Sequence, residues 1–245
     1  MKLSVVIAVY NSHGAVARNV KHFKAMDLPD DIEFIIVDDG SNPPHKIEDY
    51  NLPNLKLHQT NDKRPWTQGI ARNAGVKLAA GDYILCTDID HILSKEAIMA
   101  SYHYEGSKMI FPRYFAVLLE DGTLSQEPEI LEEYGMQMER LQTRRGLYAS
   151  VHGNTYCMKK STFWDLGGNL EARSLFGRHA GSREGEDSDL NSKWNHYAAK
   201  NGIQISVGPA IYMFPIARYH VTGDFNPKGL FHDLSQAQET QPLKP

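Results

Sequence analysis

Residues 83–90 read Tyr83-Ile84-Leu85-Cys86-Thr87-Asp88-Ile89-Asp90, so an apolar run leads directly into two carboxylates. The run is short and bounded, as is typical of a buried strand in a parallel sheet. Two carboxylates one residue apart at the end of such a strand can both reach a divalent cation, and Mg²⁺ and Mn²⁺ prefer oxygen ligands. The stretch therefore predicts a strand that carries a metal site, with a solvated acidic turn as the alternative interpretation.

The rest of the first hundred residues alternates between strand and helix patterns. Apolar, β-branched runs predict strands at residues 3–9, 33–37, 55–58 and 83–87. Helical spacing predicts a helix near residues 13–25 and a second one, lined by Ile70, Ala74 and Leu78, that ends at Gly81. This alternation predicts an α/β fold with a mostly parallel central sheet and helices on both faces.

The second half of the chain is less regular. We expect strands at residues 110–111, 115–119, 152–158, 203–207 and 211–214, and helices at residues 128–141 and 161–166. A further helix carries Leu190, Trp194 and Tyr197 on one face. Because no linker separates the halves, we expect a ligand-binding half (1–100), a second half (101–235) sharing the same sheet, and a frayed tail (236–245).

Polar side chains follow three of the predicted strands, at the point where each strand ends. These clusters are Tyr10-Asn11, Asp38-Asp39-Gly40-Ser41 and Asp88-Ile89-Asp90. Open α/β sheets bind ligands beyond the carboxyl ends of their strands. The sequence therefore predicts a ligand site at this edge of the sheet.

Composition excludes several classes of protein. With 41% hydrophobic and 23% charged residues, the chain is neither collagen-like nor wholly disordered. A net charge of −4 provides no broad positive field, which argues against nucleic acid as a partner, although a modified base as acceptor stays open.

Cysteine usage and hydropathy bear on location. Cys86 and Cys157 do not form a Cys-x-x-Cys pair and cannot frame a disulfide scaffold or a thiolate zinc site. We interpret both as reduced thiols, which suits a cytoplasmic protein. No apolar run approaches the ~20 residues needed to cross a bilayer, while a peripheral contact with a membrane stays open.

Four segments, taken in order, resemble one known family. They are 4–11 (SVVIAVYN), 34–41 (FIIVDDGS), 69–75 (GIARNAG) and 81–90 (GDYILCTDID). The ordered set closely resembles the nucleotide-binding half of family 2 glycosyltransferases, which have the GT-A fold. The resemblance covers residues 1–100 strongly and reaches residue 190 more weakly. It implies a nucleotide diphosphate sugar as donor, usually a UDP-sugar.

The resemblance also implies roles for individual residues. The donor-binding set would be Ala8, Tyr10, Asn11, Asp38, Asp39, Arg72, Asp88 and Ile89. Within it, Asp39, supported by Asp38, would accept the imide N–H of uracil, and Tyr10 would frame the base and ribose. Arg72 would approach the nucleotide or its phosphates. The alternatives are that Tyr10 only packs and that Arg72 pairs with Asp38 or Asp39.

A divalent cation, Mn²⁺ or Mg²⁺, fits the predicted reaction because departure of a nucleoside diphosphate builds up negative charge. The sequence contains neither of the two common glycine-rich phosphate-binding loops. The resemblance implies Asp90 as a direct metal ligand, Asp88 at the ribose or at a metal-bound water, and His220 as the ligand that completes the site. The alternative for His220 is an ordinary surface or core histidine. His91 and His232 are lesser candidates.

The acidic run Gly185-Glu186-Asp187-Ser188-Asp189 opens the helix that carries Leu190. In the family, a Glu-Asp pair in this setting supplies the general base, so we expect Asp187 to be the base and Glu186 to orient either Asp187 or the acceptor. The alternative is that these acids only stabilise a helix N-terminus. His152 and Trp164 are candidate acceptor-pocket residues, with ordinary packing as the alternative, which is favoured for Trp164. A single attack by the acceptor hydroxyl predicts inversion at the anomeric carbon.

These observations predict a metal-dependent inverting glycosyltransferase acting on a glycan or another hydroxyl acceptor. The alternatives are a nucleotide-sugar-binding protein without catalysis and a nucleotidyltransferase, whose glycine-rich, arginine-containing loop after the first strand is missing here. The phosphatase signature of the haloacid dehalogenases also places Asp-x-Asp after a strand. It continues with Gly-Thr, whereas this chain continues with His91-Ile92.

Overall fold

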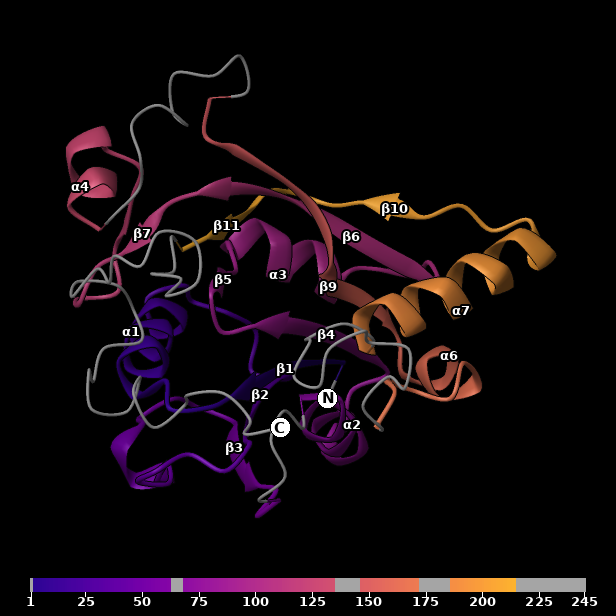
Figure 1. Cartoon of the computed structure of the whole chain (residues 1–245), viewed down its shortest axis with the longest axis horizontal. Helices are drawn as coiled ribbons and strands as arrows, with labels where there is room; N and C mark the ends of the chain where they lie inside the picture. Colours follow the sequence, from indigo (N-terminus) through magenta and orange to yellow (C-terminus); the bar gives the residue numbers. More distant parts are fainter. Residues whose placement is uncertain (1, 63–67, 135–145, 172–185, 215–245) are drawn as a thin grey trace, which may run out of the picture.

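The computed structural model describes residues 2–62, 68–134, 146–171 and 186–214 (Figure 1). Within these residues, one sheet contains the strands β1 (Leu3–Val9), β2 (Ile32–Asp38), β3 (Leu55–Gln59), β4 (Tyr83–Asp88), β5 (His91–Ile92), β6 (Lys108–Phe115), β9 (Tyr148–Lys159), β10 (Ser206–Val207) and β11 (Ile211–Met213). A separate hairpin pairs β7 (Val117–Leu118) with β8 (Leu124–Ser125).

The sheet order is β3-β2-β1-β4-β9-β6-β11-β5, and β10 pairs with β6 beside this path. The pairs among β1, β2, β3 and β4 are all parallel. β9 runs antiparallel to both β4 and β6, and β5 runs antiparallel to β11. Strands from both halves of the chain therefore join one mostly parallel sheet.

Helices cover both faces of this sheet. The described helices are α1 (His13–Lys24), the 3₁₀ turn η1 (Ile47–Asp49), α2 (Gln68–Leu78), α3 (Lys95–Tyr102), α4 (Pro128–Glu133), α6 (Lys160–Asp165) and α7 (Glu186–Asn201). One core cluster packs α1 and α3 against side chains such as Val5 and Ile7. The other packs α2, α6 and α7 against the intervening residues Val6 and Ala8.

This arrangement follows from the strand sequence. Successive side chains of a strand point to opposite faces of the sheet, and all seven residues of β1 are buried. A strand that is apolar at every position therefore needs a helical layer on each face. The predicted α/β class with helices on both faces is confirmed.

Gly75 allows α2 to pack directly against the side chains of β1 and β2. A Cβ at this position would lie 2.4 Å from Val6 Cγ1 and 2.9 Å from Val37 Cγ2. The predicted end of this helix at Gly81 is wrong, since α2 ends at Leu78. Gly81 is instead required beyond the helix, where a Cβ would meet the Ser4 backbone nitrogen at 2.8 Å.

Other boundaries differ in the second half. The stretch expected as one strand at 115–119 is divided between β6 and β7, and the strand expected at 203–207 is limited to Ser206–Val207. β9 begins earlier than expected, at Tyr148. The helix expected over 128–141 is described for Pro128–Glu133. Residues 135–141 of the expected helix and the whole tail 236–245 lie outside the described residues.

Two further observations concern the whole described chain. Cys86 and Cys157 are buried as free thiols, as the sequence predicted. In the part of the chain that the structure describes, no helix has the length and apolar character that crossing a membrane would require.

Candidate functional site

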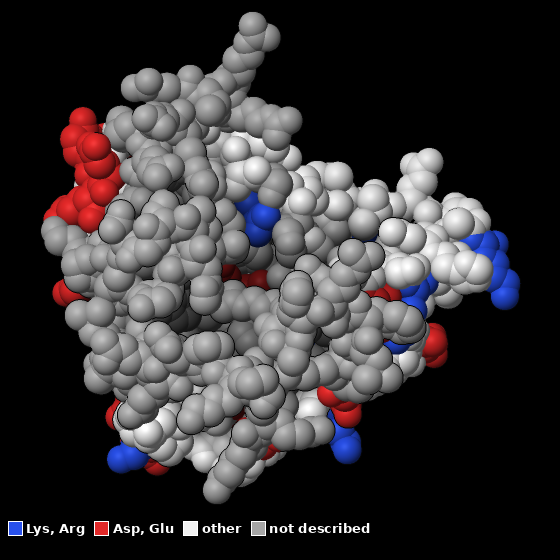
Figure 2. Space-filling view, in the orientation of Figure 1, with Lys and Arg blue, Asp and Glu red and all other residues white. Residues whose placement is uncertain are grey.

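The ends of three neighbouring strands form one edge of the sheet. The register pairs Val9 of β1 with Asp38 of β2, and Ala8 of β1 with Asp88 of β4. The polar residues that follow these strands are therefore brought to the same edge. Figure 2 shows acidic side chains near the middle of this face of the molecule.

Asp88 is held by side chains from two other elements. Its Oδ1 accepts hydrogen bonds from Gln68 Nε2, at 3.0 Å, and from the Arg72 guanidinium, both on α2. Its Oδ2 accepts from Asn154 Nδ2 of β9, at 2.8 Å. Burial by itself would raise the pKa of Asp88, but the Arg72 charge and the hydrogen bond from Asn154 hold that pKa below its usual value. Asp88 therefore remains a carboxylate.

Arg72 is buried on α2, and its contact with the donor stays a prediction. Only 1% of its surface is exposed, and it forms an ion pair with Asp88. The sequence also allowed a structural ion pair of Arg72 with Asp38 or Asp39. Arg72 does form a structural ion pair, but its partner is Asp88. In this structure Arg72 holds the Asp88 carboxylate in place and favours its ionised form.

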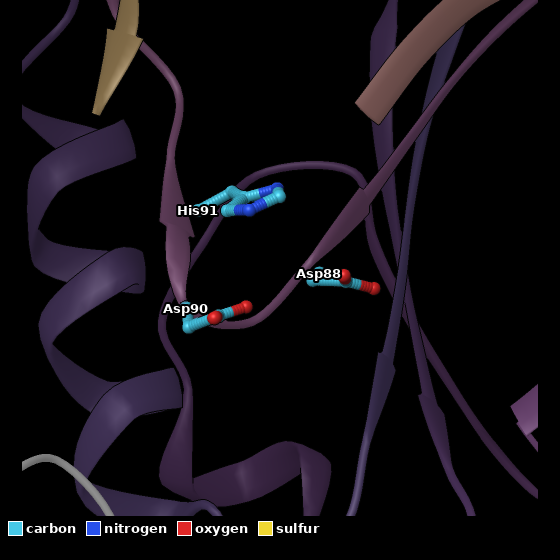
Figure 3. Close-up of side chains that lie close together, drawn as sticks. All are labelled: Asp88, Asp90 and His91. Atoms are coloured by element: carbon cyan, nitrogen blue, oxygen red, sulfur yellow. The ribbon is translucent and has the colours of Figure 1, made fainter. Parts of the chain in front are cut away.

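A cluster of three ligand-type side chains surrounds the end of β4. Asp88, Asp90 and His91 offer atoms that all lie within 4.8 Å of one another. Figure 3 shows Asp90 and His91 extending from one segment toward Asp88. The two aspartates are half-buried and His91 is buried. Half-buried carboxylates with several oxygen atoms suit a hard divalent cation.

His91 is less suited than the aspartates to bind a metal directly. Its Nε2 lies 2.8 Å from Arg113 NH1, and its Nδ1 lies 2.6 Å from Thr155 Oγ1. Because a guanidinium can only donate, Nε2 accepts and the network assigns the proton to Nδ1. A metal at Nε2 would have to displace Arg113. Both Asp88 oxygens already accept hydrogen bonds, so a metal bound to Asp88 would compete with those donors.

Asp38 and Asp39 are adjacent but have different environments. Asp38 is buried, its Oδ1 accepts from the backbone N–H of Ser41, and its Oδ2 accepts from that of His45, both at 2.9 Å. Asp39 is half-buried and accepts from Thr60 Oγ1 at 3.2 Å. Asp38 therefore shapes the loop after β2, while Asp39 lies at the more open side of it.

The loop after β1 is tied to the loop after β2. The Asn11 backbone N–H donates to Ser41 Oγ at 2.9 Å, and Asn11 Oδ1 accepts from the Asn42 N–H at 2.7 Å. Asn11 has a φ of 47°, a left-handed conformation that asparagine tolerates better than most residues. Beside it, Tyr10 is 48% exposed, which gives its ring an accessible face.

The predicted catalytic and acceptor residues are described only in part. Glu186 and Asp187 occupy the first turn of α7. Their side chains, the side chain of His152 and all of His220 and His232 lie outside the described part of the structure. Trp164, on α6, is 40% exposed and meets Phe163 edge-on, with ring centroids 5.0 Å apart. The roles of these residues therefore remain predictions.

Sequence reasoning missed the residues that support the acidic cluster. No motif in the sequence points to Gln68, Arg113, Asn154 or Thr155 as such supports. The signal for the last two was the pairing of β9 with β4. Cys86 lies opposite Tyr156 in an antiparallel ladder, which carries Thr155 and Asn154 back along β4 toward Asp88.

Comparison with known proteins gives a family match and several relatives. Residues 4–166 match the family model described as Glycosyl transferase family 2. The poly(ribitol-phosphate) β-N-acetylglucosaminyltransferase TarS of Staphylococcus aureus is 34% identical over 104 residues, which are 40% of this chain and 18% of the relative. A poly(ribitol-phosphate) β-glucosyltransferase of Bacillus spizizenii is 31% identical over 112 residues, 42% of this chain and 17% of the relative.

Solved structures show the same fold. S. aureus TarS 1–349 in complex with UDP-GlcNAc aligns with a TM-score of 0.54 and 19% identity, over 92% of this chain and 62% of that one. A mannosyltransferase of Pyrobaculum calidifontis in complex with GDP-Man and Mn²⁺ aligns with a TM-score of 0.52 and 14% identity, over 89% and 58%. The chain thus spans less than a fifth of these curated relatives and about three fifths of these solved chains.

Proposed function

This chain belongs to glycosyltransferase family 2, and on that premise we propose that it transfers a sugar from a UDP-sugar to a hydroxyl group of an acceptor. Membership of the family confirms the resemblance found in residues 1–100. The observation that carries the proposal is the meeting of Tyr10, Asp39 and the Asp88–Asp90 cluster at the carboxyl ends of β1, β2 and β4.

The base of the donor would lie between the loops after β1 and β2. A carboxylate at Asp39 accepts the imide N–H of uracil, and the exposed ring of Tyr10 offers a flat apolar surface for the base. Asp38 contributes indirectly, because its two hydrogen bonds to backbone N–H groups hold the loop that carries Asp39. Binding and orientation of the nucleotide are therefore divided between these two aspartates.

The acidic cluster fits a divalent cation beside the diphosphate. Asp90 would bind Mn²⁺ or Mg²⁺ directly, and Asp88, which already accepts three hydrogen bonds, would bind the ribose or a metal-bound water. When bound, such an ion neutralises the negative charge on the departing diphosphate. The buried Arg72 keeps Asp88 ionised and fixed in place. The solved complex that contains GDP-Man and Mn²⁺ supports this assignment through its shared fold.

The acceptor side of the reaction would involve the first turn of α7. We assign Asp187 as the general base and Glu186 as the group that orients it. The acceptor oxygen forms a bond to the anomeric carbon while the bond from that carbon to the diphosphate oxygen breaks, and Asp187 receives the hydroxyl proton. Such assistance contributes roughly 10²–10⁴-fold in rate. One displacement without a covalent intermediate inverts the anomeric configuration.

The acceptor itself is proposed only as a chemical class. Two of the relatives are named for poly(ribitol-phosphate), but the matched parts cover 40% and 42% of this chain. We therefore propose a hydroxyl on a glycan or similar molecule, which the exposed ring of Trp164 and the segment around His152 would contact.

The proposal is tested by release of UDP or GDP from UDP-GlcNAc, UDP-glucose and GDP-mannose, with Mn²⁺ or with EDTA. We expect Mn²⁺-dependent UDP release from at least one UDP-sugar, with water as acceptor. Asp90→Asn and Asp187→Asn should each lower kcat by at least about 100-fold. Asp121→Asn is the matched control, because that carboxylate is exposed and its Oδ1 accepts hydrogen bonds from the backbone N–H and the hydroxyl of Thr123 in its own turn.

The results separate the competing functions. Binding of a UDP-sugar without any release of UDP would indicate a binding protein and overturn the enzymatic proposal. Release of pyrophosphate in place of UDP would indicate nucleotidyl transfer. For an identified acceptor, NMR assignment of the anomeric proton tests inversion, and a retained configuration would exclude the single displacement.

A further inference from the structure

A buried lysine lies below the first part of α7. Lys108 opens β6 and has 1% of its surface exposed. Its Nζ lies 5.2 Å from the ring centroid of Tyr156 and 5.5 Å from that of Trp194. Among the residues that the structure describes, no carboxylate forms an ion pair with it. Burial lowers the pKa of Lys108 to about 8.

Burying an ammonium group without a carboxylate partner costs free energy of folding. A lysine at this position therefore points to a role other than filling space. The two aromatic rings offset part of the cost through cation–π attraction. A leucine or methionine would fill the same space without that cost. The feature that such a replacement would lose is the hydrogen bond from Lys108 Nζ to Asn191 Oδ1, at 2.8 Å.

Asn191 is held from a second side by the backbone of β9. A Cβ at Gly153 would lie 1.9 Å from Asn191 Nδ2 and 2.8 Å from its Cγ. Any larger residue at this position would therefore displace the Asn191 amide group. Lys108 of β6 and Gly153 of β9 together fix where Asn191, and with it this part of α7, lies on the sheet.

The contact of Asn191 with Lys108 and Gly153 lies close in the chain to both Asp187 and a partner of Asp88. Position 187 is four residues before Asn191, so the two lie one turn apart on the same face of α7. On the other side, Gly153 precedes Asn154, whose Nδ2 donates to Asp88 Oδ2 at 2.8 Å. One short stretch of β9 thus contacts α7 and supports Asp88.

We propose that Lys108 and Asn191 are positioning residues, which fix the first turn of α7 against β9 and thereby set Asp187 relative to the Asp88–Asp90 cluster. This inference rests on the proposed function, because it assumes that Asp187 is the general base. The neighbouring contacts of α7, made by Leu190 and Trp194, are apolar and non-directional. The hydrogen bond to Asn191 adds direction in a low-dielectric setting, where it is strengthened.

The expected effect is on turnover and not on donor binding. Lys108→Met keeps the volume of the side chain but removes the donor of the bond to Asn191, and Asn191→Leu removes the acceptor. A shift of about 1 Å in a catalytic group costs roughly 100-fold in rate. We therefore expect each variant to lower kcat for UDP release roughly 10- to 100-fold, while the Kd for UDP measured by calorimetry stays within about twofold of wild type.

A second variant reaches the same contact from β9. Gly153→Ala places a methyl group where Asn191 lies and should lower kcat in the same way, again without weakening UDP binding. Lys56→Met is the matched control. It removes a lysine whose Nζ lies 2.6 Å from Glu33 Oε2, near the opposite edge of the sheet, so it should lower stability but leave kcat unchanged.

A double mutant separates this inference from the proposed function. If Lys108 acts through Asp187, the pair Lys108→Met and Asp187→Asn should be no slower than Asp187→Asn alone. Normal kcat in a folded Lys108→Met beside an inactive Asp187→Asn would overturn the positioning role alone. Normal kcat in Asp187→Asn would overturn both proposals. If Lys108→Met does not fold, Asn191→Leu is compared in the same way.

Discussion

Replacing Asp38 with alanine removes a buried carboxylate that accepts hydrogen bonds from the backbone N–H groups of Ser41 and His45, at 2.9 Å each. A buried donor left without a partner costs about 1–3 kcal/mol. Two such donors give an upper range of about 2–6 kcal/mol, which water entering the space lowers toward about 2–4 kcal/mol. We expect Asp38→Ala to lose about that much free energy of unfolding.

Urea denaturation measures this loss, and calorimetry with UDP measures its effect on binding. Asp39→Ala is the matched comparison, since Asp39 is half-buried and accepts from the Thr60 hydroxyl. It should lose less than about 1 kcal/mol of stability but most of the affinity for UDP. Unchanged stability in Asp38→Ala together with a loss of affinity as large as that of Asp39→Ala would refute the division of roles between the two aspartates.

Three further predictions concern the supports of the sheet and the site. Gly75→Ala would place a Cβ 2.4 Å from Val6 Cγ1, and overpacking of this kind should lower the free energy of unfolding by about 1–3 kcal/mol. Urea denaturation measures this loss, and an unchanged midpoint of the transition would contradict the close contact of α2 with the sheet. Arg72→Met leaves Asp88 without its ion-pair partner, so we expect the free energy of unfolding to fall by about 3 kcal/mol and UDP release to become slower. Full activity of this variant would show that Asp88 needs no such support. Burial alone would raise the pKa of Glu33, but Lys56, Ser4 and the Ala80 N–H bring it below its usual value, so its contribution to stability is complete near neutral pH and is lost as pH falls through the lowered pKa. Stability measured between pH 7 and pH 3 should therefore fall less steeply in Glu33→Gln than in wild type, and equal slopes would argue against the shift.

The first hundred residues allowed much of the fold to be predicted. Buried parallel strands such as β1 and β4 are continuous apolar runs, and α1 shows its helical spacing in Val16, Val20 and Phe23. Each of these signals is local, so neighbouring residues are sufficient to reveal it. The same runs also indicated where the polar strand ends would meet.

The features that escaped prediction depend on contacts between distant segments. The insertion of β9 between β4 and β6, in the opposite direction, leaves no local pattern in the sequence. The partners of Asp88 come from α2 and from β9, so no motif contains them. The end of α2 was misjudged because a glycine beyond a helix can serve close packing as well as a cap.

The most direct test of the account compares UDP with CDP, by calorimetry in the presence of Mn²⁺. Uracil presents an imide N–H to Asp39, whereas cytosine presents an acceptor nitrogen there, and a hydrogen bond to a charged group contributes about 1.5–3 kcal/mol. Wild type should therefore bind UDP at least about tenfold more tightly than CDP, and Asp39→Asn should lose that preference. Equal affinity of wild type for the two nucleotides, or no binding of either, would contradict a uridine nucleotide site at the ends of β1, β2 and β4.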